Sequence, residues 1–276
     1  MTDIRNLFDL GGKTAVVTGG AGVLCSAIAR MLAAQSANVA ILDLAGDRAQ
    51  ALAEAINADV SAPRAIGIAT DVLDRASIEA AAAQIAASFG PVDILVNGAG
   101  GNKAQATTGP ALSFFDIPPD AAQWVFNLNF LGTLLPAQGF GRIMADRGTG
   151  VMLNISSMNA FRPLTRIPAY SAAKAAVSNF TQWLAVHMAQ EYSPNLRVNA
   201  IAPGFFLTEQ NRFLLTTETG ELTPRGQQVL DHTPAQRFGA PDDLLGTVLW
   251  LVTPASQFVT GVVVPIDGGF SAYSGV

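Results

Sequence analysis

A tyrosine and a lysine four positions apart, Tyr170 and Lys174, follow a pair of serines, Ser156 and Ser157. On a helix, residues four apart lie on the same face one turn apart, so the lysine ammonium can approach the tyrosine phenol. A nearby positive charge favours the phenolate and lowers the pKa of tyrosine from its ordinary value of about 10. The spacing therefore predicts a phenol, an ammonium and a hydroxyl around one reacting carbonyl, although the same pair also occurs on ordinary surface helices.

Short β-branched segments alternate with alanine-rich segments of helical length along most of the chain. Near-continuous apolar strands between helices are typical of a parallel sheet, and right-handed crossovers then give a doubly wound fold. We therefore expect an α/β, Rossmann-like sheet with helices on both faces. The expected strands are residues 14–18, 38–42, 65–69, 93–97, 151–155, 197–201 and 262–266, and the expected helices are 26–35, 47–57, 77–89, 121–144, 170–191 and 244–252.

No linker or internal repeat divides the chain, so we expect a single domain over residues 1–276. Its least regular stretch is an excursion at about 205–234 that is rich in threonine, glycine and polar residues. A loop excursion of that length is more often functional than idle, and our hypothesis is that it closes over a substrate.

The composition argues against several classes of partner. Only 13% of the 276 residues are charged and the formal net charge is −5, so we expect no basic surface for nucleic acid or anionic lipid. The start of the chain shows no signal pattern and no apolar run is long enough to span a bilayer, which predicts a cytoplasmic protein without a membrane partner. With one cysteine, Cys25, and two histidines, we expect neither a disulfide nor a metal site.

The first expected strand runs directly into a glycine-rich turn, Gly19-Gly20-Ala21-Gly22, and then into a helix. Glycines there allow backbone N–H groups to approach a pyrophosphate, and the helix N-terminus adds a favourable field. The second strand closes with Asp43, where a carboxylate can accept hydrogen bonds from an adenosine ribose and repel a 2′-phosphate. The pattern favours NAD over NADP, although the turn also fits an ordinary turn and Asp43 also fits a helix cap.

Further segments follow in a recognisable order, with Asn97-Gly98-Ala99-Gly100 after the fourth expected strand and Asp267-Gly268-Gly269 after the last. Together with the turn and the Tyr170 motif they resemble the short-chain dehydrogenase/reductase family over nearly the whole chain. The resemblance implies a nicotinamide-dependent oxidoreductase that acts on a small molecule. The short length and the C-terminal ending resemble the compact branch of the family, whose members usually assemble as homotetramers, and we expect the same here.

The cofactor turn departs from the compact pattern, which is Thr-Gly-x-x-x-Gly-x-Gly. Gly19 matches the first glycine, but Val23 and Cys25 occupy the positions of the other two. The spacing of Gly19 and Gly22 looks instead like the turn of the longer epimerase and dehydratase branch, so the other segments decide the branch.

The family resemblance implies a role for each of four residues in one proton relay. Tyr170 would exchange the proton with the substrate oxygen, Ser157 would hydrogen-bond that oxygen, and Lys174 would hold the nicotinamide ribose and bias Tyr170. Asn129 would hold a water in the relay. The resemblance also implies a larger cofactor-binding set, which comprises Gly19, Gly22, Val23, Leu24, Asp43, Asp71, Val72, Asn97, Gly98, Ala99, Tyr170, Lys174, Pro203, Gly204, Phe206 and Thr208.

Two segments, residues 97–102 and 203–212, are similar to short-chain mannonate/fructuronate oxidoreductases, which act on open-chain sugar acids. A polyhydroxy carboxylate needs a cation for its charge and amide or hydroxyl partners for its hydroxyls. Our leading hypothesis is an NAD-dependent oxidoreductase for a sugar acid of the D-mannonate/D-fructuronate type. The candidate substrate contacts are Asn102, Lys103, Asn159, Arg162, Arg166, Gln210, Asn211 and Arg212.

Two alternatives remain open. The same chemistry could act on a small apolar or cyclic alcohol or ketone, in a pocket walled by Phe114, Phe115, Phe161, Phe205 and Phe206. The departures in the cofactor turn also fit a non-catalytic NAD-binding module, although such a module has no physical need for an intact catalytic set of four.

Overall fold

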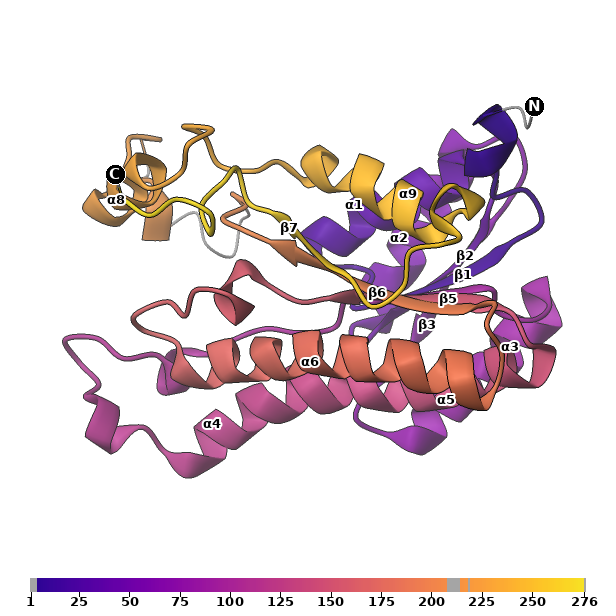
Figure 1. Cartoon of the computed structure of the whole chain (residues 1–276), viewed down its shortest axis with the longest axis horizontal. Coiled ribbons are helices and arrows are strands. Elements are labelled where there is room, and N and C mark those ends of the chain that lie inside the picture. Colours follow the sequence, from indigo (N-terminus) through magenta and orange to yellow (C-terminus); the bar gives the residue numbers. More distant parts are fainter. Residues whose placement is uncertain (1–3, 208–213, 218, 276) are drawn as a thin grey trace.

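The computed structural model describes residues 4–207, 214–217 and 219–275, and one sheet of seven parallel strands lies at its centre (Figure 1). The strand order is β3-β2-β1-β4-β5-β6-β7, so the direction of winding reverses between β1 and β4. The strands are β1 (Thr14–Thr18), β2 (Asn38–Asp43), β3 (Ala65–Ala69), β4 (Ile94–Asn97), β5 (Gly150–Ile155), β6 (Leu196–Pro203) and β7 (Val263–Ile266). This confirms the predicted doubly wound, Rossmann-like α/β fold, and each strand ends within about two residues of its expected bounds.

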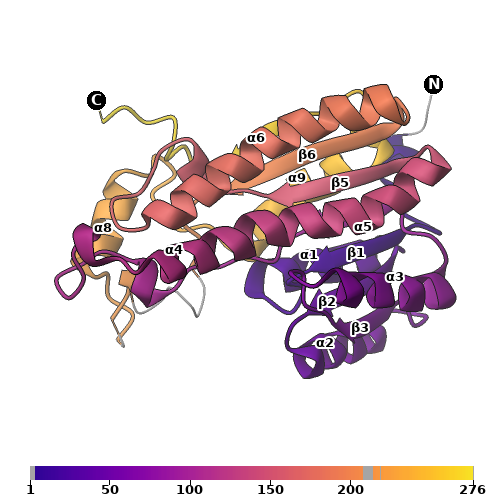
Figure 2. The ribbon, with the colours of Figure 1, turned by 90° about the horizontal axis from the view of Figure 1, so that it is seen from below.

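Helices cover both faces of the sheet because its central strands are buried on both sides (Figures 1 and 2). Alternate side chains of β1 enter different hydrophobic clusters, Val17 on one face and Val16 on the other. The Val17 cluster includes residues of α1 (Val23–Ala34), α2 (Gly46–Asp59) and α9 (Leu245–Val252). The Val16 cluster includes residues of α3 (Arg75–Phe89), α5 (Gly132–Arg147) and α6 (Pro168–Glu191).

The helix expected at 121–144 is the middle of a longer rod. It begins with α4 (Pro119–Phe126), passes through a π-helical turn, η4 (Asn127–Leu131), and continues into α5. Figure 2 shows this rod beside α6. A π-turn holds an extra residue and thereby changes the direction of the side chains around it, and such turns frequently occur at functional sites.

The excursion at about 205–234 contains a helix that the sequence analysis did not predict, α8 (Pro224–Asp231). Thr223 caps it by accepting a hydrogen bond from the Gly226 N–H at 3.0 Å, and Pro224 occupies its first turn. Short helical segments make up the remaining described elements, which are η1 (Ile4–Phe8), η2 (Ala104–Ala106), η3 (Phe114–Asp116), η5 (Met158–Ala160), η6 (Pro241–Leu244) and η7 (Pro254–Ser256).

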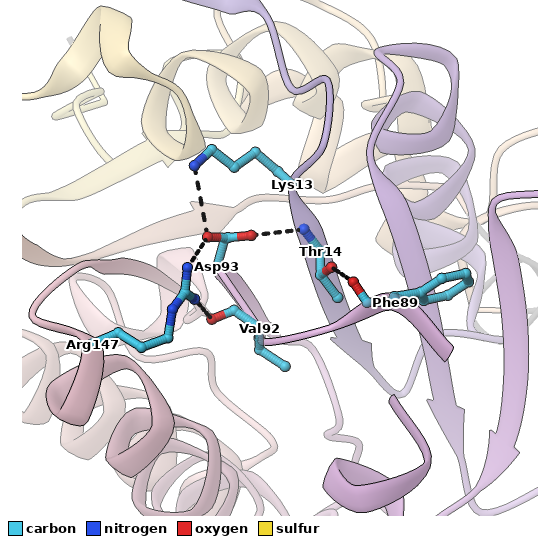
Figure 3. Close-up of polar contacts among 6 residues, drawn as sticks. All are labelled: Lys13, Thr14, Phe89, Val92, Asp93 and Arg147. Atoms are coloured by element: carbon cyan, nitrogen blue, oxygen red, sulfur yellow. Dashed lines mark hydrogen bonds and ion pairs between the residues drawn. The ribbon is translucent and has the colours of Figure 1, made fainter. Parts of the chain in front are cut away.

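One buried carboxylate fixes the edge of the sheet at which the strands begin (Figure 3). Asp93 accepts hydrogen bonds from the Thr14 N–H and from Arg147 Nη2, each at 3.0 Å, and Lys13 Nζ lies 3.7 Å away. Arg147 also donates to the Val92 carbonyl at 2.9 Å. These charge-assisted contacts hold the starts of β1 and β4 against the end of α5. They thereby fix the alignment of β1 with β4, and this alignment extends to the carboxyl ends of the two strands.

A second buried charge anchors β6. The Arg197 guanidinium donates to the carbonyl oxygens of Leu251, Thr253 and Val259 and to Ser256 Oγ, at 3.0–3.2 Å. Burial lowers the pKa of Arg197, and its Nη1 and Nη2 groups donate to these four acceptors without a carboxylate. The contacts also provide partners for carbonyls at the end of α9, which fixes α9 against the sheet.

None of the helices in the described part of the chain is long and apolar enough to cross a membrane. Within the same ranges, no group of three or more His, Cys, Asp or Glu side chains is arranged to hold a metal ion.

Candidate active site

The end of β5, the start of α6 and the π-turn η4 place the four predicted catalytic residues at the carboxyl edge of the sheet. Ser157 follows β5, Tyr170 and Lys174 lie on the first turns of α6, and Asn129 lies in η4. Ser157 lies close enough to Tyr170 for its side chain to lower the pKa of the phenol. The Lys174 ammonium donates to the Ile155 carbonyl, the last of β5, at 2.7 Å.

The environment of Tyr170 differs from the one that the spacing of Tyr170 and Lys174 predicted. Burial raises the pKa of Tyr170 above its ordinary value, and the nearby Ser157 side chain opposes that shift. Lys174 Nζ lies 5.6 Å from the centre of the tyrosine ring and bonds to the Ile155 carbonyl. The pKa of Tyr170 is therefore raised where the spacing predicted a lowered one, because burial outweighs the groups that favour the phenolate, of which Ser157 is one.

Lys174 is a buried cation without a carboxylate partner among the described residues. Its exposed fraction is 4%, and burial lowers its pKa to about 8, a shift that nearby Cys25 opposes. Among the described residues, one of its three N–H donors has a partner, the Ile155 carbonyl. The ammonium can therefore offer its remaining donors to a bound molecule.

Asn129 binds the segment that follows β4 rather than pointing freely into the site. Its Nδ2 donates to the Gly101 and Val125 carbonyls, both at 2.7 Å, and its Oδ1 accepts from the Gly101 N–H at 3.2 Å. A Cβ on Gly100 would lie 2.7 Å from Asn129 Oδ1 and 3.3 Å from Lys174 Nζ. The Gly100 backbone therefore lies between the amide of Asn129 and the ammonium of Lys174, so the four predicted residues belong to one site.

The turn after β1 forms a cradle that fits a dinucleotide. Gly19 has a φ of +60°, and a Cβ on it would lie 2.8 Å from the Ala99 Cα, so only glycine allows this approach of the two strand ends. Gly22 precedes α1 without a side-chain cap, and the N–H groups of Val23 and Leu24 in the first helical turn have no intrahelical acceptor. Such N–H groups are the usual partners of a pyrophosphate.

Cys25 and Gly98 explain why the turn departs from the family pattern. The Cys25 thiol lies where a side chain on Gly98 would begin, and a Cβ there would also lie 2.9 Å from the Thr18 carbonyl. The family pattern that these segments resemble has glycine at the position of Cys25 and, in Asn-Asn-Ala-Gly, asparagine at the position of Gly98. A larger residue at position 25 therefore occupies the space that a smaller residue at position 98 leaves. Burial raises the pKa of the Cys25 thiol to about 12, and the thiol is therefore a packing group rather than a nucleophile.

Thr18 holds the segment after β4 in place, and the sequence analysis did not single it out. Its buried hydroxyl accepts hydrogen bonds from the N–H groups of Gly98 and Ala99, at 3.1 and 3.3 Å. Asn97 donates from Nδ2 to Asn154 Oδ1 at 2.9 Å, which joins β4 to β5 inside the sheet. A polar residue at the end of an apolar strand was the available signal for Thr18.

The ends of the neighbouring strands β2 and β3 carry the residues expected near the adenosine. Asp43 is half-buried and accepts from the Ala21 N–H at 3.1 Å and from the Ala45 N–H at 3.0 Å, so it supports both the cofactor turn and the start of α2. Asp71 is exposed and accepts from the Leu73 N–H at 2.8 Å, and Val72 is buried. The side chains of Asp43 and Asp71 thus retain acceptor capacity toward a ligand.

The segment that follows β6 packs against the end of β7 and the residue after it. Gly204 donates its N–H to the Ile266 carbonyl at 2.9 Å, directly after Pro203, and a Cβ on Gly204 would lie 2.6 Å from Asp267 Cβ. The Phe206 side chain is buried against Gly239. Thr208 lies outside the described residues.

The candidate substrate residues differ in how free their polar groups are. Asn102 Nδ2 donates to Thr107 Oγ1 at 2.8 Å, and Lys103 Nζ lies 4.8 Å from the centre of the Trp124 ring. Asn159 is buried two positions after Ser157, and its N–H donates to Ser157 Oγ at 3.3 Å. Arg162 is exposed, and Gln210, Asn211 and Arg212 lie outside the described residues.

The phenylalanines expected to wall an apolar pocket do not gather in one place. Phe114 and Phe115 pack edge-to-face on each other and are 65% and 90% exposed. Phe205 packs against Phe270 with ring centres 5.2 Å apart, and Phe206 belongs to the core. The described residues therefore give little support to the apolar alternative.

Arg225 is a second residue that sequence reasoning missed. It lies in the first turn of α8 and is half-buried, and Arg166 is close enough to lower its pKa further after burial. The Thr223-Pro224 sequence is typical of a helix start and was the signal for α8.

Three comparisons place the chain among known proteins. The short chain dehydrogenase family profile matches residues 13–219. The uncharacterized oxidoreductase UxuB of Bacillus subtilis (strain 168) is 50% identical, over 97% of this chain and 98% of its own. A crystal structure of a candidate D-mannonate oxidoreductase from Haemophilus influenzae, with bound NAD, is 46% identical, has a TM-score of 0.91 and matches 99% of this chain and 100% of its own. A gluconate 5-dehydrogenase from Burkholderia cenocepacia, in complex with NADP and tartrate, is 31% identical with a TM-score of 0.85, over 98% and 100% of the two chains.

The contact between Cys25 and Gly98 predicts a coupling between substitutions at the two positions. Gly98→Ala places a methyl group against the thiol and should lower the free energy of unfolding by about 2 kcal/mol. Cys25→Ala in the same chain removes the thiol, so the double variant should be more stable than the sum of the two single effects predicts. Urea denaturation of the four proteins measures this coupling.

Gly246→Ala is the matched control, because no atom lies within 4 Å of a Cβ at that position. Its effect should add to that of Cys25→Ala. Additivity of Gly98→Ala and Cys25→Ala to within about 0.5 kcal/mol would contradict the proposed exchange of volume.

Proposed function

Because the chain belongs to the short-chain dehydrogenase family, we propose that it is an NAD-dependent oxidoreductase for a sugar acid of the D-mannonate/D-fructuronate type. In this reaction hydride moves between nicotinamide and a secondary alcohol or ketone. The observation that carries the proposal is the buried ammonium of Lys174 beside the ring of Tyr170, with Ser157 close enough to lower the pKa of the phenol. We further propose that the chain works as one domain, in which the excursion at about 205–234 forms part of the substrate site.

The residues of the site suit acid–base chemistry at one substrate oxygen. In the direction of oxidation, Tyr170 accepts the hydroxyl proton while the carbon loses hydride, and the alcohol becomes a ketone. Ser157 hydrogen-bonds the same oxygen and favours the phenolate. Bound NAD supplies the hydride acceptor at C4 of its nicotinamide. Lys174 offers its two unused N–H donors to ribose hydroxyls, and Asn129 fixes the Gly101 backbone beside it.

Asp43 supports the preference for NAD. Its carboxylate lies at the end of β2, bonded to the Ala21 N–H of the cofactor turn, where it would repel a 2′-phosphate. Arg48 is exposed and donates to the Ala21 carbonyl at 3.0 Å, so a positive charge also lies beside the cofactor turn. The NAD bound to the Haemophilus protein supports the proposal, whereas the Burkholderia protein binds NADP.

The sugar-acid substrate is supported by two observations. The Haemophilus protein is a candidate D-mannonate oxidoreductase, and the Burkholderia protein is a gluconate 5-dehydrogenase. The polar groups of Asn102, Lys103, Asn159 and Arg162 lie on the segments that flank Ser157 and Gly101, and we propose that they contact substrate hydroxyls.

We propose that the protein is a cytoplasmic homotetramer, with no nucleic-acid or membrane partner. The outer face of α6 supports self-association, because Trp183 and Tyr192 are 56% and 52% exposed and lie in a series of ring contacts through His187.

Light scattering on the protein as it elutes from a size-exclusion column measures the molecular mass of the assembly. A monomer at micromolar concentration would count against the homotetramer.

The reaction is tested by following NADH formation over a panel of aldonic acids, neutral sugars and cyclic alcohols, with NAD and NADP in parallel. We expect turnover of an aldonate with NAD, and a loss of at least about 100-fold in Tyr170→Phe because the variant cannot accept the proton. The rate of oxidation should increase with pH, since burial raises the pKa of the phenol and oxidation requires the phenolate.

Tyr192→Phe is the matched control, because Tyr192 lies at the end of α6 away from Ser157. Turnover only of apolar alcohols would favour the alternative substrate class. NAD binding without any turnover, unchanged in Tyr170→Phe, would favour a non-catalytic module and contradict the proposal.

A further inference from the structure

Ser156 is the member of the serine pair that the proposed reaction does not use. It is 2% exposed and follows the last residue of β5, so it lies between Ile155, whose carbonyl binds the Lys174 ammonium, and Ser157. Its N–H donates to the Ile201 carbonyl of β6 at 2.8 Å, which extends the pairing of the two strands. Both strands lie against α6 (Figures 1 and 2), so the Ser156 backbone is fixed where the sheet meets the helix that carries Lys174.

The Ser156 hydroxyl binds α6 at two points. It donates to the Lys174 main-chain carbonyl at 3.1 Å, and its oxygen lies 2.7 Å from Ser178 Oγ, one helical turn further along. A serine hydroxyl carries one hydrogen, so a Ser156 that donates to Lys174 accepts from Ser178. The contacts thus form one directed chain, from Ser178 to Ser156 to the Lys174 carbonyl. Successive hydrogen bonds in a largely buried chain polarise and strengthen one another.

Two consecutive residues at the end of β5 consequently hold both ends of Lys174. The Ile155 carbonyl accepts from Nζ at 2.7 Å, and the Ser156 hydroxyl donates to the carbonyl of the same lysine. A lysine side chain loses much rotamer freedom when it is ordered, so a lysine held only at its ammonium would keep several conformations. Contacts at both ends restrict it to few, and the N–H donors that have no partner among the described residues then keep one direction.

We propose that Ser156 is a positioning residue for Lys174, which keeps the free N–H donors of the lysine directed at ribose hydroxyls of bound NAD, and that Ser178 supports it from α6. This role rests on the proposed function, because it gives a task to a residue that touches neither substrate nor cofactor. A packing role would have a different effect, since a hydroxyl that only joins β5 to α6 would change the stability and leave the affinity for NAD as it is.

Thr181 provides a matched control on the same helix. It is fully buried, and its hydroxyl accepts from Asn154 Nδ2 at 2.9 Å and donates to the Val177 carbonyl at 2.8 Å. It therefore joins β5 to α6 as Ser156 does, but in the described part of the chain it forms no hydrogen bond with Lys174 or Ser156. Thr181→Val removes these hydrogen bonds and nearly keeps the shape of the side chain.

The test measures the affinity for NAD and for ADP by titration calorimetry in the wild type, Ser156→Ala, Ser156→Thr and Thr181→Val. ADP contains the adenosine half of the dinucleotide and lacks the nicotinamide ribose. We expect Ser156→Ala to raise the Kd for NAD about tenfold, the size expected for one buried hydrogen bond, and to leave the Kd for ADP unchanged. Ser156→Thr keeps a hydroxyl and should restore part of the loss. Thr181→Val should lower the unfolding temperature without changing either Kd.

Ser178→Ala tests the same chain with a milder change, because it leaves the Ser156 hydroxyl in place. It should raise the Kd for NAD about threefold, and it should add nothing in the Ser156→Ala background, since Ser178 acts through Ser156. Circular dichroism verifies the fold of each variant, and Ser178→Ala alone decides the question if Ser156→Ala does not fold.

An unchanged Kd for NAD in the folded serine variants would overturn the positioning role. Equal losses for NAD and ADP, or an equal loss in Thr181→Val, would overturn it as well, because they would indicate a general effect on the fold. The proposed function fails in a different way. A wild type that binds NAD but oxidises no aldonate would remove that function, and a loss of NAD affinity confined to the serine variants would still support the role of Ser156.

Discussion

The buried ammonium of Lys174 is the constraint on which the rest of the site depends. Burial of a charge without a carboxylate destabilises the fold, and in the described part of the chain this ammonium bonds to the Ile155 carbonyl alone. The end of β5, the first turns of α6 and a glycine at position 100 must all be in place to hold it, because a Cβ on Gly100 would lie 3.3 Å from Nζ. Arg197 is buried in a similar way, but four acceptors of the protein take hydrogen bonds from its guanidinium group. The difference marks Lys174 as the cation that is available to a ligand.

Equally close packing occurs at other points along the carboxyl edge of the sheet. Gly19 and Gly204 are glycines because neighbouring backbone or Cβ atoms occupy the position of a side chain. Cys25 fills the volume that Gly98 leaves, so a turn that departs from its family at two points still has a continuous packed wall. At the opposite edge, the contacts of Asp93 set the starts of β1 and β4 and thereby the register in which these close approaches occur.

Local pattern was sufficient to predict the strands, the order of the helices and the position of Ser157, Tyr170 and Lys174, because each depends on periodicity or on short spacing. Features that depend on contacts between distant segments were not predictable. The π-turn that turns the Asn129 amide toward Gly101, the burial that raises the Tyr170 pKa and the pairing of Cys25 with Gly98 are of this kind. Arg225 was missed because the short helix that carries it has a start signal but little apolar periodicity.

The most direct test of this account is the free energy of unfolding of the wild type and of Lys174→Met between pH 6 and pH 11, measured with urea. Burial lowers the Lys174 pKa from 10.5 to about 8, so below pH 8 the folded protein holds a charge that the unfolded chain solvates better. The variant should be more stable by about 3 kcal/mol at pH 7 and inactive, and this advantage should be lost as the pH rises from 8 to 10.5. A variant that is less stable at pH 7, or a difference that does not change with pH, would contradict the claim that the buried Lys174 ammonium lowers the free energy of unfolding.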